Sequence, residues 1–244
     1  MYNCFMSNEL EWPTEQADYS ENPRKQESIE GQNAAIRFFD PEDKKDMGRL
    51  HEIISDEEVQ RWMDDVSDFD KEGLLEWAQE IQAYKDKPKL FVVSGRSGGV
   101  GKRDIGETQG FVYTYPDADI VKLRSMFEDR ILLERQLENP IFELSYAKFP
   151  DAEDCQIASA VRQVCIKLGN IMDIDIDPRT GEPKLTVTAY VDPVNKKSVK
   201  VLEAAGFVKR GKVLYSSEAT KKDDVYVLDW NLLSSKLQNS RSTF

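Results

Sequence analysis

The sequence has few of the residues on which disulfide-bonded and histidine-dependent proteins rely. Its 244 residues include three cysteines, Cys4, Cys155 and Cys165, and a single histidine, His51. Three scattered cysteines do not form a disulfide framework, and the first residues, MYNCFMSNELEWP, lack the cationic region and apolar core of a secretory signal. We therefore expect a reducing, cytoplasmic setting, in which Cys155 and Cys165 pack as small apolar side chains.

The single histidine also limits the chemistry. Ser-His-Asp and Cys-His mechanisms need a histidine beside a nucleophile, whereas helical periodicity around His51 predicts a packed or surface side chain. No zinc-ligand spacing is present. Segment 172–184 resembles the start of a calcium loop, but Pro178 replaces the required glycine and Lys184 replaces the last carboxylate. We therefore expect no metal site.

The chain lacks an excess of positive charge and a long apolar run. It has 33 Lys and Arg against 45 Asp and Glu, a formal net charge of −12. Broad nucleic-acid binding needs a basic face, so it is not expected. No apolar run approaches the roughly 18 residues that span a membrane, so no membrane partner is expected. Acidity either attracts cationic ligands or only keeps the protein in solution.

Length and composition predict one globular domain between two tails. Residues 1–33 are interpreted as a mobile acidic N-terminal tail, 34–233 as the domain and 234–244 as a C-terminal tail. Alternating apolar residues predict strands, and helical spacing predicts helices. The expected strands are 34–39, 89–95, 108–116, 139–150, 184–193, 207–216 and 224–232. The expected helices are one that Asp40 caps, 56–65, 70–84, 120–137, 155–169 and 195–206.

The glycine-rich stretch SGRSGGVGKRD, 94–104, invites comparison with a phosphate-binding loop, G-x-x-x-x-G-K-[ST]. Arg96 stands where the first glycine is needed, and Arg103 stands where the magnesium-binding hydroxyl is needed. A helix must also follow such a loop, but the next residues alternate as in a strand. We therefore interpret the stretch as a connection between two antiparallel strands.

The segment LTVTAYVDPVNKKSVKVLEAAGF, 185–207, reads as strand, loop, short helix and strand. It resembles the GNAT family of N-acetyltransferases, in the branch of the ribosomal-protein N-terminal acetyltransferases, whose motif is N-x-x-S-x-x-(V/L)-(L/A)-E-x-x-G-F. The matching residues are Asn195, Ser198, Val201, Leu202, Glu203, Gly206 and Phe207. The order of elements also fits. The resemblance implies an α/β (α+β) fold with a mixed, mostly antiparallel sheet, splayed fourth and fifth strands (141–148 and 185–191) and flanking helices.

The resemblance implies that acetyl-CoA lies between the splayed strands, with its diphosphate at the start of the following helix. The implied cofactor-binding residues are Gln156, Ile157, Ala158, Ser159, Val187, Ala189, Asn195 and Ser198. The family loop (Q/R)-x-x-G-x-(G/A) is altered, because Glu153 replaces the basic or amide residue and Gln156 replaces the glycine. Lys196, Lys197 and Lys200 either offset this negative charge or form a solvated helix face.

The resemblance also implies direct acetyl transfer to an amine. Glu143, near the expected splay, is the candidate base. Ser198 is the candidate acid, because Leu202 stands where many members have tyrosine. A backbone N–H of Val187 or Ala189 is expected to bind the oxyanion. The residues expected to line the acceptor side are Tyr146, Tyr190 and Tyr215.

The sequence thus predicts an acetyl-CoA-dependent N-acetyltransferase, a monomer or homodimer, whose acceptor is a protein N-terminus, a lysine or a small cationic amine. The alternative is a degenerate GNAT-fold protein that binds a ligand or partner without turnover, which the altered loop favours. Segments 95–107 and 117–138 are long for the family core, and each could shape a substrate groove or a dimer contact.

Overall fold

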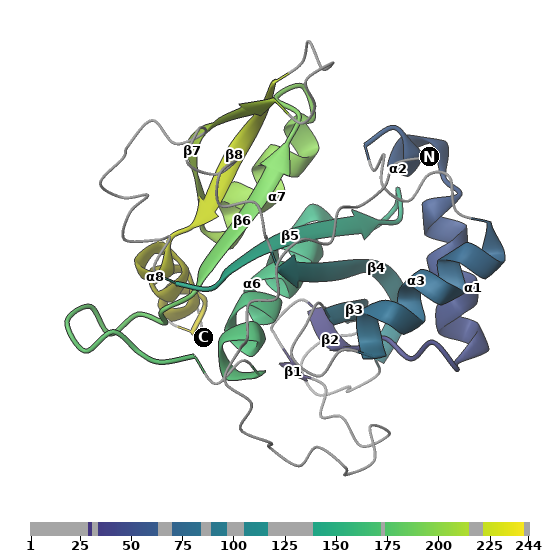
Figure 1. Ribbon diagram of the computed structural model, residues 1–244, viewed down its shortest axis with the longest axis horizontal. Helices are drawn as coiled ribbons and strands as arrows, with labels where there is room; N and C mark the ends of the chain where they lie inside the picture. The colour runs from purple at the N-terminus through teal and green to yellow at the C-terminus, as the bar shows by residue number, and fades with distance from the viewer. Residues whose placement is uncertain are drawn as a thin grey trace, which may run out of the picture.

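Helices cover both faces of one mixed sheet. The computed structural model describes residues 29–30, 34–62, 70–83, 89–96, 105–116, 139–171, 174–214 and 222–241. Within these ranges eight strands form the sheet, in the order β1-β2-β3-β4-β5-β6-β8-β7 (Figure 1). Neighbouring strands are antiparallel except β5 and β6, which are parallel. The predicted class, α/β (α+β) with a mostly antiparallel sheet, is confirmed.

The element bounds agree with most of the predicted ranges. The strands are β1 Ile29–Glu30, β2 Ala34–Phe38, β3 Lys89–Arg96, β4 Ile105–Pro116, β5 Ile141–Lys148, β6 Thr186–Val191, β7 Phe207–Leu214 and β8 Lys222–Leu228. The helices are α1 Lys44–Ile54, α2 Glu57–Gln60, α3 Lys71–Ala83, α6 Asp154–Ile171, α7 Lys196–Ala205 and α8 Trp230–Arg241. The predicted helix 120–137, the connection 97–104 and most of the N-terminal tail lie outside the described residues.

Two clusters of buried side chains join the helices to opposite faces of the sheet. Leu50 of α1 and Leu74 of α3 belong to one cluster, and Val161 of α6 belongs to the other. Because successive side chains of a strand point to opposite faces, β5 supplies both clusters: Leu144 packs with α6 and Ala147 packs with α1 and α3. This strand therefore runs through the middle of the core.

The parallel pair β5 and β6 stays together only at its beginning. The register runs from Ile141 opposite Thr186 to Glu143 opposite Thr188. Beyond this point β5 continues to Lys148 beside β4 alone, while β6 pairs with β8. Figure 1 shows the two strands diverging. The predicted splay is confirmed, and among the described residues it leaves one edge of β5 without a strand partner from residue 144 onward.

An ion pair fixes α1 to β2, the second strand of the sheet. Asp46 in the first turn of α1 is 1% exposed, and its two carboxylate oxygens accept hydrogen bonds from Nη1 and Nη2 of Arg37 on β2. The backbone N–H of Asp40 donates to the same carboxylate at 3.2 Å. The bidentate geometry is the favourable one for arginine and carboxylate. The contact therefore sets where α1 leaves the strand.

Two predicted helix boundaries are wrong. The N-cap of α1 is Asp43, whose side chain accepts from the backbone N–H of Lys45 at 2.8 Å. Asp40 was the predicted cap, but its side chain accepts from Glu42 N in a turn that precedes the helix. Likewise Gly169 does not end α6, which continues to Ile171. A single glycine only weakens a helix, so it is a poor stop signal by itself.

The end of the chain is helical where the sequence predicts a strand and then a tail. Strand β8 ends at Leu228, and α8 runs through residues predicted as tail. Asp229 caps this helix by accepting from Leu232 N at 2.9 Å, and Leu233 is 2% exposed. The indole N–H of Trp230 donates to Leu185 O at 2.9 Å. In the described ranges, no helix combines the length and apolar character needed to cross a membrane.

Candidate active site

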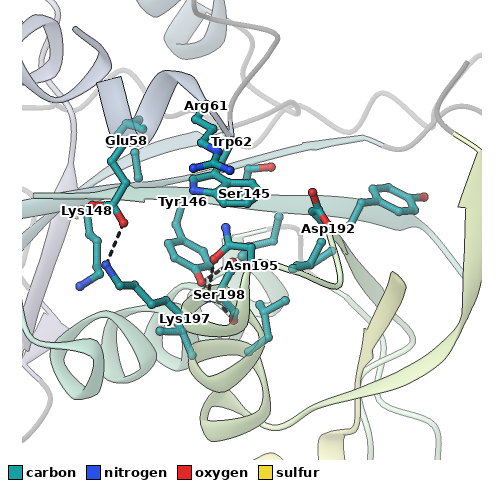
Figure 2. A pocket seen from close by; sticks show the side chains of 18 of the residues that line it. Glu58, Arg61, Trp62, Ser145, Tyr146, Lys148, Asp192, Asn195, Lys197 and Ser198 are labelled. Carbon is teal, nitrogen blue, oxygen red and sulfur yellow. Dashed lines mark hydrogen bonds and ion pairs between the residues drawn. The ribbon is translucent and has the colours of Figure 1, made fainter. Parts of the chain in front are cut away.

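A pocket of about 350 Å³ opens where β5 and β6 diverge (Figure 2). Its walls are the outer half of β5, the end of β6, the first turns of α7, and α2 with the residues that follow it. Glu143 and Ser198 both line it, although they lie far apart in the sequence. The divergence of the strands therefore creates a hollow in the middle of the sheet that both halves of the chain line.

The free edge of β5 presents backbone groups to this pocket. The N–H of Thr186 donates to Pro140 O at 3.0 Å, so even-numbered residues of β5 and β6 direct their backbone groups toward each other. Past the splay, the N–H and C=O of Tyr146 therefore face the gap. An extended ligand can bond to them as a strand would. The same alternation turns the N–H groups of Val187 and Ala189 toward β8, so the ladder favours Tyr146 over both as the oxyanion donor.

The first turn of α7 forms one wall of the pocket. Asn195 caps this helix, its side chain accepting from Ser198 N at 3.1 Å, and Gly206 with φ 105° ends it. The hydroxyls of Tyr146 and Ser198 lie 2.7 Å apart, and the tyrosine also donates to Ser198 O at 3.2 Å. Figure 2 shows the two side chains pointing toward each other. Burial raises the pKa of Tyr146, so its phenol keeps its proton at neutral pH.

Glu143 lines the pocket where β5 and β6 part. It occupies the last position of β5 that pairs with β6 and is 6% exposed. Glu143 is next to Leu144 in the strand, so its side chain points to the opposite face of the sheet. That face carries α1 and α3, whereas α7 lies on the other side. The pocket therefore has a buried carboxylate on one face of the sheet and a hydroxyl on the other.

The start of α6 differs from the predicted cofactor loop. Ile157 and Ala158 are buried in the core, and Ser159 is 6% exposed beside Gln163. The predicted site residues that line the pocket are Glu143, Ala189, Asn195 and Ser198. The ones that do not line it are Gln156, Ile157, Ala158, Ser159 and Val187. Tyr215 lies outside the described residues.

Sequence reasoning did not identify two lysines that line the pocket, Lys148 and Lys197. Lys148 on β5 bonds Asp154, the first residue of α6, at 2.8 Å and donates to Ala152 O at 2.7 Å. Lys197 bonds Glu58 of α2 at 2.8 Å. Lys148 carried no sequence signal, and Lys197 was only one of three candidates on its helix. Trp62 after α2 also lines the pocket, and no local pattern connected it to a site.

Comparison with known proteins gives a family match. The profile described as acetyltransferase (GNAT) domain matches residues 36–208, which is the greater part of the chain. No curated protein matches. The match does not distinguish branches of the family, so the resemblance to the ribosomal-protein N-terminal acetyltransferases stays a prediction.

Solved structures of the same fold include several acetyltransferases. One is a GNAT-family acetyltransferase from Bacillus anthracis, 15% identical with a TM-score of 0.56 over 84% of this chain and 99% of that one. Another is aminoglycoside acetyltransferase AAC(6')-Ib with coenzyme A and kanamycin, which is 14% identical with a TM-score of 0.52 over 86% of this chain and 99% of that one. A third is spermidine N-acetyltransferase from Vibrio cholerae with CoA and spermine, which is 13% identical with a TM-score of 0.52 over 80% of this chain and 92% of that one. At these identities the likeness concerns the fold alone.

Proposed function

Because the chain belongs to the GNAT family of acetyltransferases, we propose that it transfers the acetyl group of acetyl-CoA directly to the amine of a small cationic acceptor. The observation that carries this proposal is the pocket at the splay. There the free edge of β5 faces the first turn of α7, and Glu143 and Ser198 lie on opposite walls. The acetyltransferase activity follows from the family, whereas the acceptor and the residue roles are our inference.

The pocket suits acetyl-CoA, which supplies the acetyl group as a thioester. The backbone C=O of Tyr146 faces the gap and can accept from an amide N–H of an extended pantetheine arm, which leaves the N–H of Tyr146 for the acetyl carbonyl. The hydroxyl of Ser198 and the carboxylate of Glu143 add polar groups to the walls. The carboxylate of Asp154 would repel a diphosphate at the start of α6, but the ammonium group of Lys148, 2.8 Å from that carboxylate, brings a positive charge to the same place.

Each residue of the pocket has a distinct role in the proposed transfer. Glu143 removes the proton of the ammonium group, so that the neutral amine can attack. The N–H of Tyr146 polarises the acetyl carbonyl. As the C–S bond breaks, the attacking nitrogen gives up its second proton and Ser198 relays a proton to the leaving sulfur, so that an amide and the free thiol of CoA form. The phenol of Tyr146, 2.7 Å from the Ser198 hydroxyl, holds the serine in place. Direct transfer needs no covalent acyl-enzyme, and the described residues that line the pocket include no cysteine.

The charge of the pocket supports a cationic acceptor. Its lining includes five carboxylates against three cations, two of which, Lys148 and Lys197, are already in ion pairs. The carboxylates are those of Asp56, Glu58, Glu143, Asp192 and Asp223. Carboxylates in excess attract ammonium groups. The similar structures that bind kanamycin and spermine also contain amine ligands. We therefore infer that a small amine with more than one positive charge is the acceptor class, ahead of a protein N-terminus or a lysine.

Calorimetry with CoA and a thiol-release assay over a panel of amines test the proposal together. We expect micromolar CoA binding, and faster thiol release with spermine than with a monoamine of similar length. The Asn195→Ala, Ser198→Ala double variant should bind CoA less tightly. Absence of CoA binding up to millimolar concentration would contradict the proposal and favour a binding protein on an acetyltransferase fold.

Replacing Ser198 alone by alanine should lower kcat about tenfold. This is less than the usual gain from general acid catalysis, because a thiolate with a pKa of about 8.5 leaves readily. Tyr146→Phe should also lower kcat, but less strongly, since the hydroxyl of Tyr146 only orients the serine. Steady-state kinetics at saturating acetyl-CoA measure both effects. Ser235→Ala, on the exposed face of α8, is the matched control, and an equal loss in that variant would contradict the assignment.

A further inference from the structure

Two lysines of the pocket are each held by a carboxylate from another element. Lys148, the last residue of β5, bonds Asp154 of α6, and Lys197, in the first turn of α7, bonds Glu58 of α2, both at 2.8 Å. Both lysines line the pocket. Figure 2 shows the Glu58 and Lys197 contact as a dashed line beside Lys148. The four side chains therefore gather two positive and two negative charges at one side of the cavity.

The fold brings these lysines together through a neighbouring contact. The hydroxyl of Tyr146 bonds Ser198 and thereby joins the end of β5 to the start of α7. Lys148 follows Tyr146 by two positions, so its side chain points to the same face of the sheet. Lys197 immediately precedes Ser198. The pKa of Lys197 is raised, mainly by Glu58 and to a smaller extent by Asp154. The ammonium group of Lys197 therefore lies within the electrostatic field of both carboxylates.

The pair between Glu58 and Lys197 adds little to stability. The two side chains are 53% and 64% exposed, and exposed pairs of this kind contribute between nothing and a small net gain. The pair does, however, connect α2 to α7 across the pocket. A ligand with more charge and more acceptor oxygens than a carboxylate can replace Glu58 at low cost.

We propose that Lys148 and Lys197 bind the diphosphate of CoA by exchanging Asp154 and Glu58 for phosphate oxygens. The inference rests on the proposed function. Glu153 and Asp154 add negative charge at the start of α6, so a diphosphate bound near its backbone N–H groups needs positive charge from side chains as well. The positive charge therefore comes from side chains on β5 and α7. Glu58 competes with the cosubstrate for Lys197.

Calorimetric binding of CoA to the full chain tests the proposal without turnover. Lys197→Met and Lys148→Met should each weaken CoA binding about tenfold, because each removes charge-assisted hydrogen bonds to phosphate. Glu58→Gln should strengthen binding about threefold, because it releases Lys197 from an exposed ion pair. Opposite signs for the two partners of one pair are not expected of a merely structural contact. Lys200→Met, one turn along α7 and outside the pocket, should leave the affinity unchanged.

Shortened ligands identify the phosphate involved. Dephospho-CoA keeps the diphosphate, so the lysine variants should lose as much affinity for it as for CoA. Pantetheine, measured by competition against CoA, has no phosphate and should bind all variants equally. A loss seen with CoA but not with dephospho-CoA would overturn the diphosphate assignment in favour of the 3'-phosphate.

The remaining outcomes separate the inference from the proposed function. If the native chain binds CoA while Lys197→Met and Glu58→Gln leave its affinity unchanged, the inference fails and the proposed function stands. If the native chain does not bind CoA, both fail. Because Lys148 also bonds Ala152 O, Lys148→Met could unfold the loop before α6. Lys148→Arg, which keeps the charge, should bind CoA almost as tightly as the native chain and should have the same melting temperature.

Discussion

Glu143→Gln should lower kcat by about 100-fold or more, the range expected when a general base is lost. Glu143 is 6% exposed in the lining of the pocket, and glutamine keeps its shape and most of its hydrogen-bonding capacity. The fold and the affinity for CoA should therefore be preserved. Steady-state kinetics with the best amine of the panel, together with calorimetric titration of CoA, measure the two quantities.

The pH dependence of this variant distinguishes a base from a structural residue. Without Glu143 the acceptor must lose its proton in water, and amines of the lysine type have pKa values of about 10.4. The residual kcat/KM should therefore rise about tenfold for each pH unit below that value. Glu76→Gln, on the exposed face of α3, is the control and should behave like the native chain. A flat profile with the same loss of kcat would show that Glu143 acts through packing.

Arg37→Met should lower the free energy of unfolding by on the order of 3 kcal/mol, the lower end for breaking a buried pair. We take the lower end because the arginine side chain is 35% exposed, so solvent screens part of the interaction. The cost arises because Asp46, 1% exposed, would keep its charge with only the N–H of Asp40 as partner. Urea denaturation followed by circular dichroism measures the change.

Two comparisons make the stability prediction specific. Arg179→Met, on an exposed turn, should change the free energy of unfolding by less than about 0.5 kcal/mol. The double variant Arg37→Met, Asp46→Leu should recover most of the loss, since replacing both partners of a buried pair with apolar side chains is often neutral. If the single variant is as stable as the native chain, the contact does not hold α1 to the sheet.

The sequence alone predicted most elements of the fold. Alternation and helical spacing act within about ten residues, so the strands β2 to β7 and the helices α3, α6 and α7 were predicted close to their observed bounds, whereas the predicted strand 224–232 runs past the end of β8 into α8. The stretch 94–104 was interpreted as a connection between antiparallel strands, and the described strands on its two sides, β3 and β4, do pair in that sense. The motif around Asn195 and Gly206 predicted both ends of α7 and led to the family.

Local patterns were insufficient where two adjacent signals compete. Asp40 and Asp43 are both capping residues within four positions, and only the turn geometry decides that Asp43 begins α1. At the other end of the chain, α8 has a weak apolar stripe. It is stabilised by the burial of Leu233 and the hydrogen bond from Trp230 to Leu185 O, which are contacts with distant segments.

The sequence by itself determined the elements, the family and the acid and base candidates, Ser198 and Glu143. Only the tertiary structure decided what surrounds them. The order of the sheet brings α2 to the pocket, and the splay after Glu143 frees the edge of β5 at Tyr146. The tertiary structure also pairs Lys148 and Lys197 with carboxylates from other elements. The physical reason is that these contacts join residues far apart in the chain, through strand register and helix packing that no short pattern encodes.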